Sequence, residues 1–213
     1  MEHTSGQDNI TPQAAFLTNL RSRTAALHQQ LEDLPLSKSL MREDVTLEDY
    51  ARYLVYMRDV MTFFDTQILS RMQHIIPEPV KRLKTDQIDR DLEFLKHKDI
   101  AVEGPASTAM PDIHDDATAM GMAYVIEGST LGGRVIMKHI TAKLPIQEEA
   151  GGQFFAGYKN ETGPMWKQFL TALQEYAVAD NHEEAVIQGA MNGFSMIAQH
   201  FQQHELLTET KTV

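Results

Sequence analysis

Apolar residues recur every three to four positions along nearly the whole chain, and runs of alternating β-branched residues are missing. This spacing is typical of amphipathic helices, so the sequence predicts an all-α fold. A length of 213 residues is enough for one substantial core and does not require a second. We therefore expect a single-domain multi-helix bundle, with helices at residues 11–33, 46–74, 80–97, 115–144, 151–176 (interrupted near Gly163-Pro164) and 182–207.

Turn and capping residues indicate where these helices end. Thr11 followed by Pro12 is typical of a helix start, and the step from Leu34 to Pro35 is typical of a helix end. The most loop-like stretch is EGPASTAMPDIHDD at residues 103–116, which is too short for a domain linker. The expected organisation is a poorly ordered N-terminus at residues 1–10, a helical domain at 11–207 and a C-terminal tail at 208–213.

Composition narrows the classes of function. The chain has no cysteine, which excludes disulfides, thiolate ligands and cysteine nucleophiles. Its formal charge of -11 argues against nucleic acid or an anionic membrane as the main partner. No secretion signal and no run of ~20 apolar residues is visible, so a cytoplasmic location is expected. Three basic spots, taken singly, are expected to be solvated helix faces: Arg21 with Arg23; Lys81 with Arg82 and Lys84; Lys138 with Lys143.

The stretch EGSTLGGR, residues 127–134, places three glycines inside a predicted helix. Each glycine costs about 1 kcal/mol relative to alanine in such a position. Gly128 and Gly132 are four residues apart and so share one helix face, with Gly133 beside them. Two interpretations remain open from spacing alone. Either the glycines let another helix pack closely, or they leave room for a flat ligand near Ser129 and Thr130.

A second feature lies in LRSRTAALHQQLED, residues 20–33. His28 precedes Glu32 by four residues, so the carboxylate can hold one imidazole nitrogen while the other faces a metal. Arg21 lies about two turns upstream on roughly the same face. Such a pair is more often a surface contact. Because apolar residues share this face, however, we expect His28 to be partly turned toward apolar surroundings.

Other histidines offer weaker signals. His200 and His204 have metal-ligand spacing, but they fall in a polar tail and are expected at a solvated helix end. His114-Asp115-Asp116 is interpreted as a loop followed by an acidic helix start rather than a cation site.

The two stronger motifs, LR-x-x-T-x-x-x-H-x-x-L-E and G-S-T-L-G-G about a hundred residues later, together resemble biliverdin-producing heme oxygenases, most closely their bacterial branch. The resemblance implies that heme lies between the N-terminal, proximal helix and a kinked, glycine-containing distal helix. It implies His28 as the proximal iron ligand, Glu32 as the acid that orients it, and Gly128, Ser129, Gly132 and Gly133 as the distal backbone. It further implies propionate contacts from Arg21, Tyr124 and, more loosely, Lys167.

The resemblance also implies a reaction in which heme b is both substrate and oxygen-activating cofactor. Heme is cleaved to biliverdin, CO and free iron with O2 and electrons from a ferredoxin, a flavodoxin or a reductase. The propionate contacts favour the α-meso carbon, and Arg21, Arg23 and Lys138 are candidates for donor docking. A bilin-accepting protein is a further possible partner. The mammalian branch has an aspartate where this chain has Ser129, which leaves the proton-delivery group unassigned.

Two alternatives stay open. A non-degrading heme-binding or carrier protein on the same fold would use His28 and the glycines equally well. A purely structural bundle would make His28–Glu32 a surface pair and the glycines a packing seam.

Overall fold

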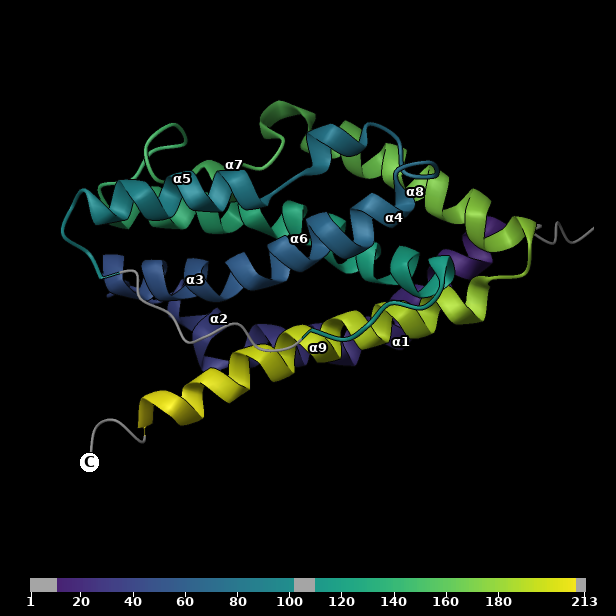
Figure 1. Ribbon diagram of the computed structural model, residues 1–213, viewed down its shortest axis with the longest axis horizontal. Coiled ribbons are helices and arrows are strands. Elements are labelled where there is room, and N and C mark those ends of the chain that lie inside the picture. Colours follow the sequence, from purple (N-terminus) through teal and green to yellow (C-terminus); the bar gives the residue numbers. More distant parts are fainter. Residues whose placement is uncertain (1–10, 102–109, 210–213) are drawn as a thin grey trace, which may run out of the picture.

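The architecture is that of a helical bundle (Figure 1). The computed structural model describes residues 11–101 and 110–209, with residues 203–209 described as backbone only. Within this part of the chain the only β features are isolated bridges around Gln147, so the predicted all-α fold is confirmed. The longer helices are α1 (Pro12–Asp33), α3 (Leu47–Phe63), α5 (Thr85–Lys96), α6 (Asp116–Lys143), α8 (Thr162–Ala179) and α9 (Glu183–Glu209).

Side-chain caps fix the starts of three of these helices. Thr11 accepts a hydrogen bond from the Ala14 amide at 3.2 Å at the start of α1. Thr46 and Asp49 form a reciprocal capping box at the start of α3. Asp115 accepts from the Thr118 amide at 2.8 Å, which confirms the acidic helix start expected for α6.

Short elements connect the long helices, and two of the predicted boundaries are wrong. The short elements are α2 (Pro35–Ser39), the π-turn η1 (Phe64–Leu69), α4 (Ser70–Met72), the 3-10 turns η2 (Pro79–Arg82) and η3 (Lys159–Glu161), and α7 (Gln153–Ala156). The expected helix at 80–97 is a 3-10 turn followed by α5. The break expected near Gly163-Pro164 lies earlier, because Gly157 ends α7 at a φ of 55°. Pro164 falls in the first turn of α8, where its missing N–H has no intrahelical partner to lose.

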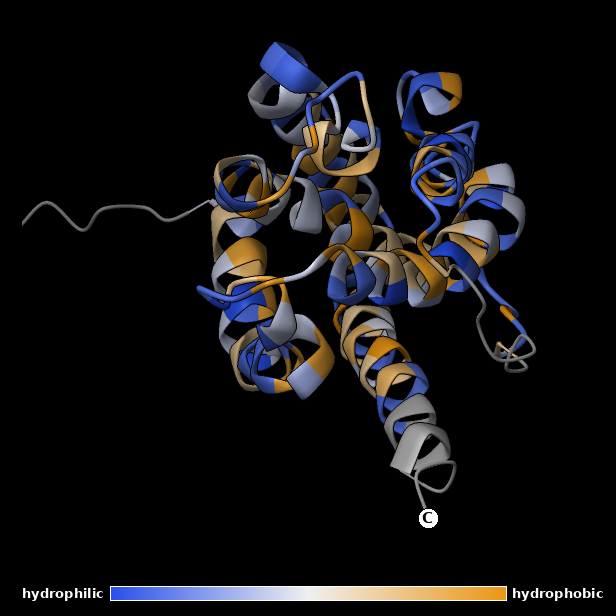
Figure 2. Cartoon of the chain, turned by 90° about the vertical axis from the view of Figure 1, so that its left-hand side faces the viewer, coloured by the Kyte–Doolittle hydropathy of each residue, from blue (hydrophilic) through white to orange (hydrophobic). Residues whose placement is uncertain are grey.

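Helices α6 and α9 cross at very close range through glycines. A Cβ on Gly121 would lie 2.1 Å from the Val186 carbonyl oxygen, and one on Gly189 would lie 2.5 Å from that of Thr118. This crossing joins the two longest helices, while α1 lies beside α9 along the lower edge of Figure 1. Figure 2, turned by 90°, shows apolar faces of the helices directed toward one another across the bundle. The helix–helix seam is thus built by glycines outside the EGSTLGGR stretch.

Two predictions about charged and polar side chains are wrong. Arg82 and Lys84, expected on a solvated face, are buried. His200, expected at a solvated helix end, is also buried, with Nε2 3.1 Å from the Tyr56 carbonyl oxygen. In both cases elements that are distant in sequence pack against a segment whose local sequence is polar. The side chain of His204 lies outside the described residues.

The predicted domain limits remain predictions. Residues 1–10 and 210–213 lie outside the described part of the chain, whereas residues 208 and 209 of the predicted tail continue α9. Helix α6 is assigned without interruption through its glycines, and the predicted kink remains a prediction. No helix in the described ranges is long and apolar enough to cross a membrane.

Candidate functional site

The proximal half of the predicted site lies on α1. His28 Nε2 is 3.2 Å from Glu32 Oε1, and each side chain is 59% exposed. The His28 ring also lies 5.4 Å, between centroids, from the Phe194 ring on α9. The imidazole is therefore half open to solvent and half against an aromatic ring, as its helix face predicted. Phe194 was not anticipated, because a contact between residues so distant in sequence leaves no local pattern.

The distal half lies on α6, along one stripe of helical spacing. The stripe consists of Tyr124, Gly128, Leu131, Gly132 and Val135. A Cβ added to Gly132 would meet no atom within 4 Å, so a close packing seam is the wrong interpretation at this position. Leu131 is 42% exposed and Val135 is 62% exposed. An apolar, bare-backbone surface on a buried helix is thus left uncovered by the rest of the described chain.

The other two glycines of the motif contact neighbouring elements. A Cβ on Gly128 would lie 3.5 Å from the Trp166 ring of α8, and one on Gly133 would lie 3.4 Å from the Phe155 carbonyl oxygen. Trp166 also lies 5.7 Å, between ring centroids, from Tyr124. An added Cβ would make only ordinary van der Waals contacts at Gly128 and Gly133 and none at Gly132, so packing within the described chain does not require glycine at these three positions.

The two halves meet where the side chains of Arg21 and Thr24 on α1 approach the Tyr124 hydroxyl on α6. Burial raises the pKa of the Tyr124 hydroxyl, and the nearby Arg21 and Thr24 side chains partly oppose that rise. The phenol is therefore protonated and able to donate at neutral pH. Thr24 is buried and was missed by the sequence analysis, although it stands in the quoted motif.

Two predicted residues have other surroundings. Ser129 is exposed, and its hydroxyl donates to the Ile126 carbonyl oxygen at 2.7 Å. Lys167 is exposed on α8 beside Trp166 in sequence, and none of the described contacts joins its side chain to the other predicted residues.

These surfaces fit a heme. A flat apolar group needs an uncovered apolar face, which Leu131, Gly132 and Val135 provide on α6. Its iron needs a ligand with an accessible nitrogen, which His28 provides on α1. Its propionates need donors at one edge, and Arg21 and Tyr124 already lie together there.

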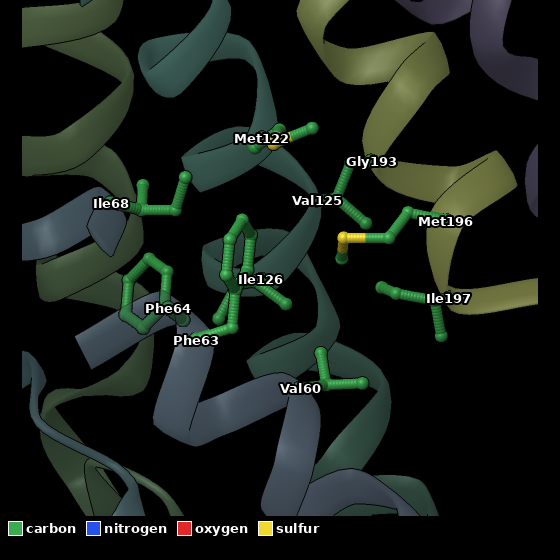
Figure 3. Close-up of a pocket in the computed structure, with 10 residues that line it drawn as sticks. All are labelled: Val60, Phe63, Phe64, Ile68, Met122, Val125, Ile126, Gly193, Met196 and Ile197. Atoms are coloured by element: carbon green, nitrogen blue, oxygen red, sulfur yellow. The ribbon is translucent and has the colours of Figure 1, made fainter. Parts of the chain in front are cut away.

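A small apolar pocket lies on a different part of α6, between α3, η1, α6 and α9 (Figure 3). Its lining includes Val60, Phe64, Met122 and Ile197, and none of the predicted site residues. Since every residue around it is apolar or glycine, it has no donor to bind a propionate carboxylate and no imidazole to bind iron. Among the described residues, no three His, Cys, Asp or Glu side chains cluster as a metal site either. The α1–α6 surfaces are therefore the candidate site.

Comparison with known proteins shows the family to which the chain belongs. The sequence model of the heme oxygenase family matches residues 14–203. Heme oxygenase PigA of Pseudomonas aeruginosa is 27% identical over 197 residues, covering 88% of this chain and 94% of the relative. The heme oxygenase of Xanthomonas campestris is 26% identical over 162 residues, covering 75% and 93%.

Solved structures show the same fold. The NO- and CO-bound heme oxygenase of Neisseria meningitidis superposes with a TM-score of 0.73 at 24% identity, over 89% of this chain and 91% of that one. The heme oxygenase of Leptospira interrogans gives a TM-score of 0.68 at 17% identity, over 88% and 98%. With the family model spanning most of the chain, the protein belongs to the bacterial heme oxygenases, and its reaction is the oxidative degradation of heme.

Proposed function

We propose that this chain binds heme b between α1 and α6 and cleaves it to biliverdin, CO and free iron. The observation that carries the proposal is a pair of uncovered surfaces, the half-exposed His28 on α1 and the open Gly132 stripe on α6. The contact of Arg21 with Tyr124 joins the two helices at one end of these surfaces. When bound, heme supplies both the iron that activates O2 and the carbon that is oxidised.

His28 and Glu32 form the proximal side. One imidazole nitrogen faces the Glu32 carboxylate, so the other is left for the iron. A hydrogen bond to Glu32 fixes the ring orientation and makes the ligating nitrogen a better donor. Phe194 supports the ring from α9.

Arg21 and Tyr124 fix the heme in its plane. A guanidinium and a phenol that lie together offer charge-assisted hydrogen bonds to a propionate. Lys167 adds a third donor if its long side chain extends along α8 toward the same edge. With the heme fixed this way, the α-meso carbon is the expected position of attack.

Gly128, Ser129, Gly132 and Gly133 form the distal side. Gly132 leaves helix backbone exposed with open space beside it, so a bound heme could lie directly against the α6 backbone. The Ser129 hydroxyl donates its hydrogen bond to the Ile126 carbonyl oxygen, so the hydroxyl oxygen can still accept a hydrogen bond from water. An ordered water held there, rather than the serine itself, delivers the proton.

O2 and electrons come from outside the chain. A ferredoxin, a flavodoxin or a reductase would dock at a basic surface beside the heme edge, where Arg21 and Lys138 are exposed. Arg23 is less suitable than its sequence position suggests, because it is paired with Glu184 at 2.9 Å. A bilin-accepting protein would take the product.

Hemin titration followed by turnover with ascorbate or a ferredoxin system tests the proposal. We expect a Soret band that shifts on binding and then disappears as biliverdin forms. His28→Ala should lose the iron ligand and, with it, the shifted band and turnover. His97→Ala is the matched control, because His97 also pairs with a glutamate on a helix surface, at 3.4 Å from Glu93. A stable complex without biliverdin would instead support the heme carrier, and a His28→Ala spectrum equal to wild type would refute the site.

A further inference from the structure

A cluster of charged side chains is completely buried behind the glycine stripe. Arg82 and Glu127 are each 0% exposed and form an ion pair, and Lys84 is 2% exposed. The Tyr158 hydroxyl donates to Glu127 Oε1 at 2.8 Å and accepts from Lys84 Nζ at 2.6 Å. Burying charges is costly, and an apolar core of equal volume is often as stable. Stability alone therefore does not account for this cluster.

Arg82 connects three elements. Its Nε donates to the Pro77 carbonyl oxygen at 2.7 Å, and its second terminal nitrogen donates to that of Met165 at 3.2 Å. The remaining terminal nitrogen holds Glu127 of α6. A planar guanidinium holds these partners at fixed angles, which a lysine ammonium does not. The result is a rigid link between η2, α8 and α6.

Glu127 directly precedes Gly128, so the position of this link on α6 matters. At about 100° per residue, Glu127 and Arg134 lie on one side of the helix, roughly a third of a turn from the glycine stripe. Arg134 donates to the Lys159 carbonyl oxygen at 2.9 Å, two turns beyond Glu127. Two anchors on one side of α6 fix its rotation about its own axis. They therefore fix the direction in which Gly128 and Gly132 face.

We infer that Glu127, held by Arg82 and Tyr158, is a positioning residue that sets the rotation of α6 and so the placement of the distal glycines over heme. The inference rests on the proposed function for its consequence, which is where on the porphyrin the reaction occurs. The rotation itself is a property of the heme-free protein.

Tyr158→Phe and Arg82→Lys test the inference. The first removes only the hydroxyl that joins Glu127 to Lys84. The second keeps the charge but cannot hold the Pro77 and Met165 carbonyls together. Ile88→Val on α5 is the control, because it truncates a fully buried side chain that makes none of the hydrogen bonds of the cluster.

Amide hydrogen exchange of the full-length, heme-free protein is the first measurement. We expect amides at residues 128–133 to exchange about tenfold faster in both variants, while those at 118–123, at the α9 crossing, stay near wild type. With hemin, the share of α-biliverdin should fall in favour of other isomers. Exchange that rises evenly along the chain, as in Ile88→Val, would overturn the inference, as would an Arg82→Lys protein that matches wild type. If wild type makes no biliverdin, the proposed function fails, and the exchange data still decide the role of Glu127.

Discussion

Gly121 and Gly132 lie on the same helix, eleven positions apart, in opposite surroundings. A Cβ at Gly132 would enter open space, whereas a Cβ at Gly121 would collide with the backbone of α9 at 2.1 Å. The same residue type therefore serves helix packing near the start of α6 and an uncovered surface near its middle. Alanine substitution separates these two roles.

Gly132→Ala should fold well and bind hemin poorly. Alanine is favoured over glycine within a helix, so the free energy of unfolding should rise by up to about 1 kcal/mol in the heme-free protein. The added methyl group would occupy space that the proposed site leaves for heme, so hemin affinity and biliverdin yield should fall. Urea unfolding and hemin titration measure the two effects. Unchanged affinity and turnover would remove Gly132 from the site.

Gly121→Ala is the control for that experiment. Its methyl group would meet the Val186 carbonyl oxygen, and backbone cannot move aside cheaply. A loss of about 3 kcal/mol in the free energy of unfolding is expected from such overpacking. Equal destabilisation of both variants would contradict the assignment of Gly121 to helix packing and of Gly132 to an uncovered surface.

At the scale of single residues, local spacing revealed His28 and Glu32 because their interaction spans one helical turn. The same reasoning failed for Arg82, since nothing near it in sequence shows that Glu127 and the Met165 carbonyl will surround it. Burial of a charge depends on partners that come from other elements. Contacts of this kind become visible only in the folded chain.

Among the elements, short α7 depends on a carboxylate from α5. Asp91 accepts hydrogen bonds from the Gln153 and Phe154 amides at 2.9 and 2.8 Å, and so satisfies the first amides of α7. Burial raises the pKa of Asp91 to about 6, and the two amide hydrogen bonds only partly oppose that rise. Since the pKa of the unfolded chain is near 3.8, the folded protein binds this proton more tightly.

Asp91 should therefore make stability depend on pH in a definite direction. The stability that comes from its raised pKa is fully present below about pH 4 and is lost as the pH rises through about 6. The Asn side chain of Asp91→Asn cannot titrate. The thermal unfolding midpoint of wild type, relative to that of this variant, should therefore fall as the pH rises across that interval. Thermal unfolding at several pH values gives the difference. A difference that stays constant or rises with pH would contradict the assignment.

The boundaries of the elements show what periodicity cannot predict. Residues 46–74 were expected as one helix, and the chain is helical from α3 through α4, but η1 inserts a wider turn between them. That turn carries Asp65, whose carboxylate accepts from the Lys84 and Thr85 amides at 3.0 and 2.8 Å. The start of α5 is thus capped by a residue about twenty positions earlier. A one-residue change of register within a helix leaves the apolar pattern nearly unchanged, so the sequence does not show it.

For the whole molecule, the predicted site is assembled from helices that are far apart in the sequence. The ordered pair of motifs on α1 and α6 indicated the family, which the family model confirms, and most of the candidate site, because each motif is local to one helix. The anchors that set how these helices face each other come from η2, α8 and α9, and no local motif marks them. Between α1 and α6, Arg21 and Thr24 approach the Tyr124 hydroxyl. A ligand that binds both helices should therefore stabilise the entire bundle.

Hemin should raise the thermal midpoint of this protein through that bridging role. A ligand present at 100 times its Kd that binds only the folded state adds about 2.7 kcal/mol. For a chain of 213 residues this corresponds to roughly 5–10 °C. His28→Ala should lose most of the shift, whereas His97→Ala should keep it, because the His97–Glu93 contact lies at the C-terminal end of α5, outside the site. Hydrogen exchange should also slow on both α1 and α6. Protection of only one of these helices, or a full shift in His28→Ala, would show that heme does not bridge them.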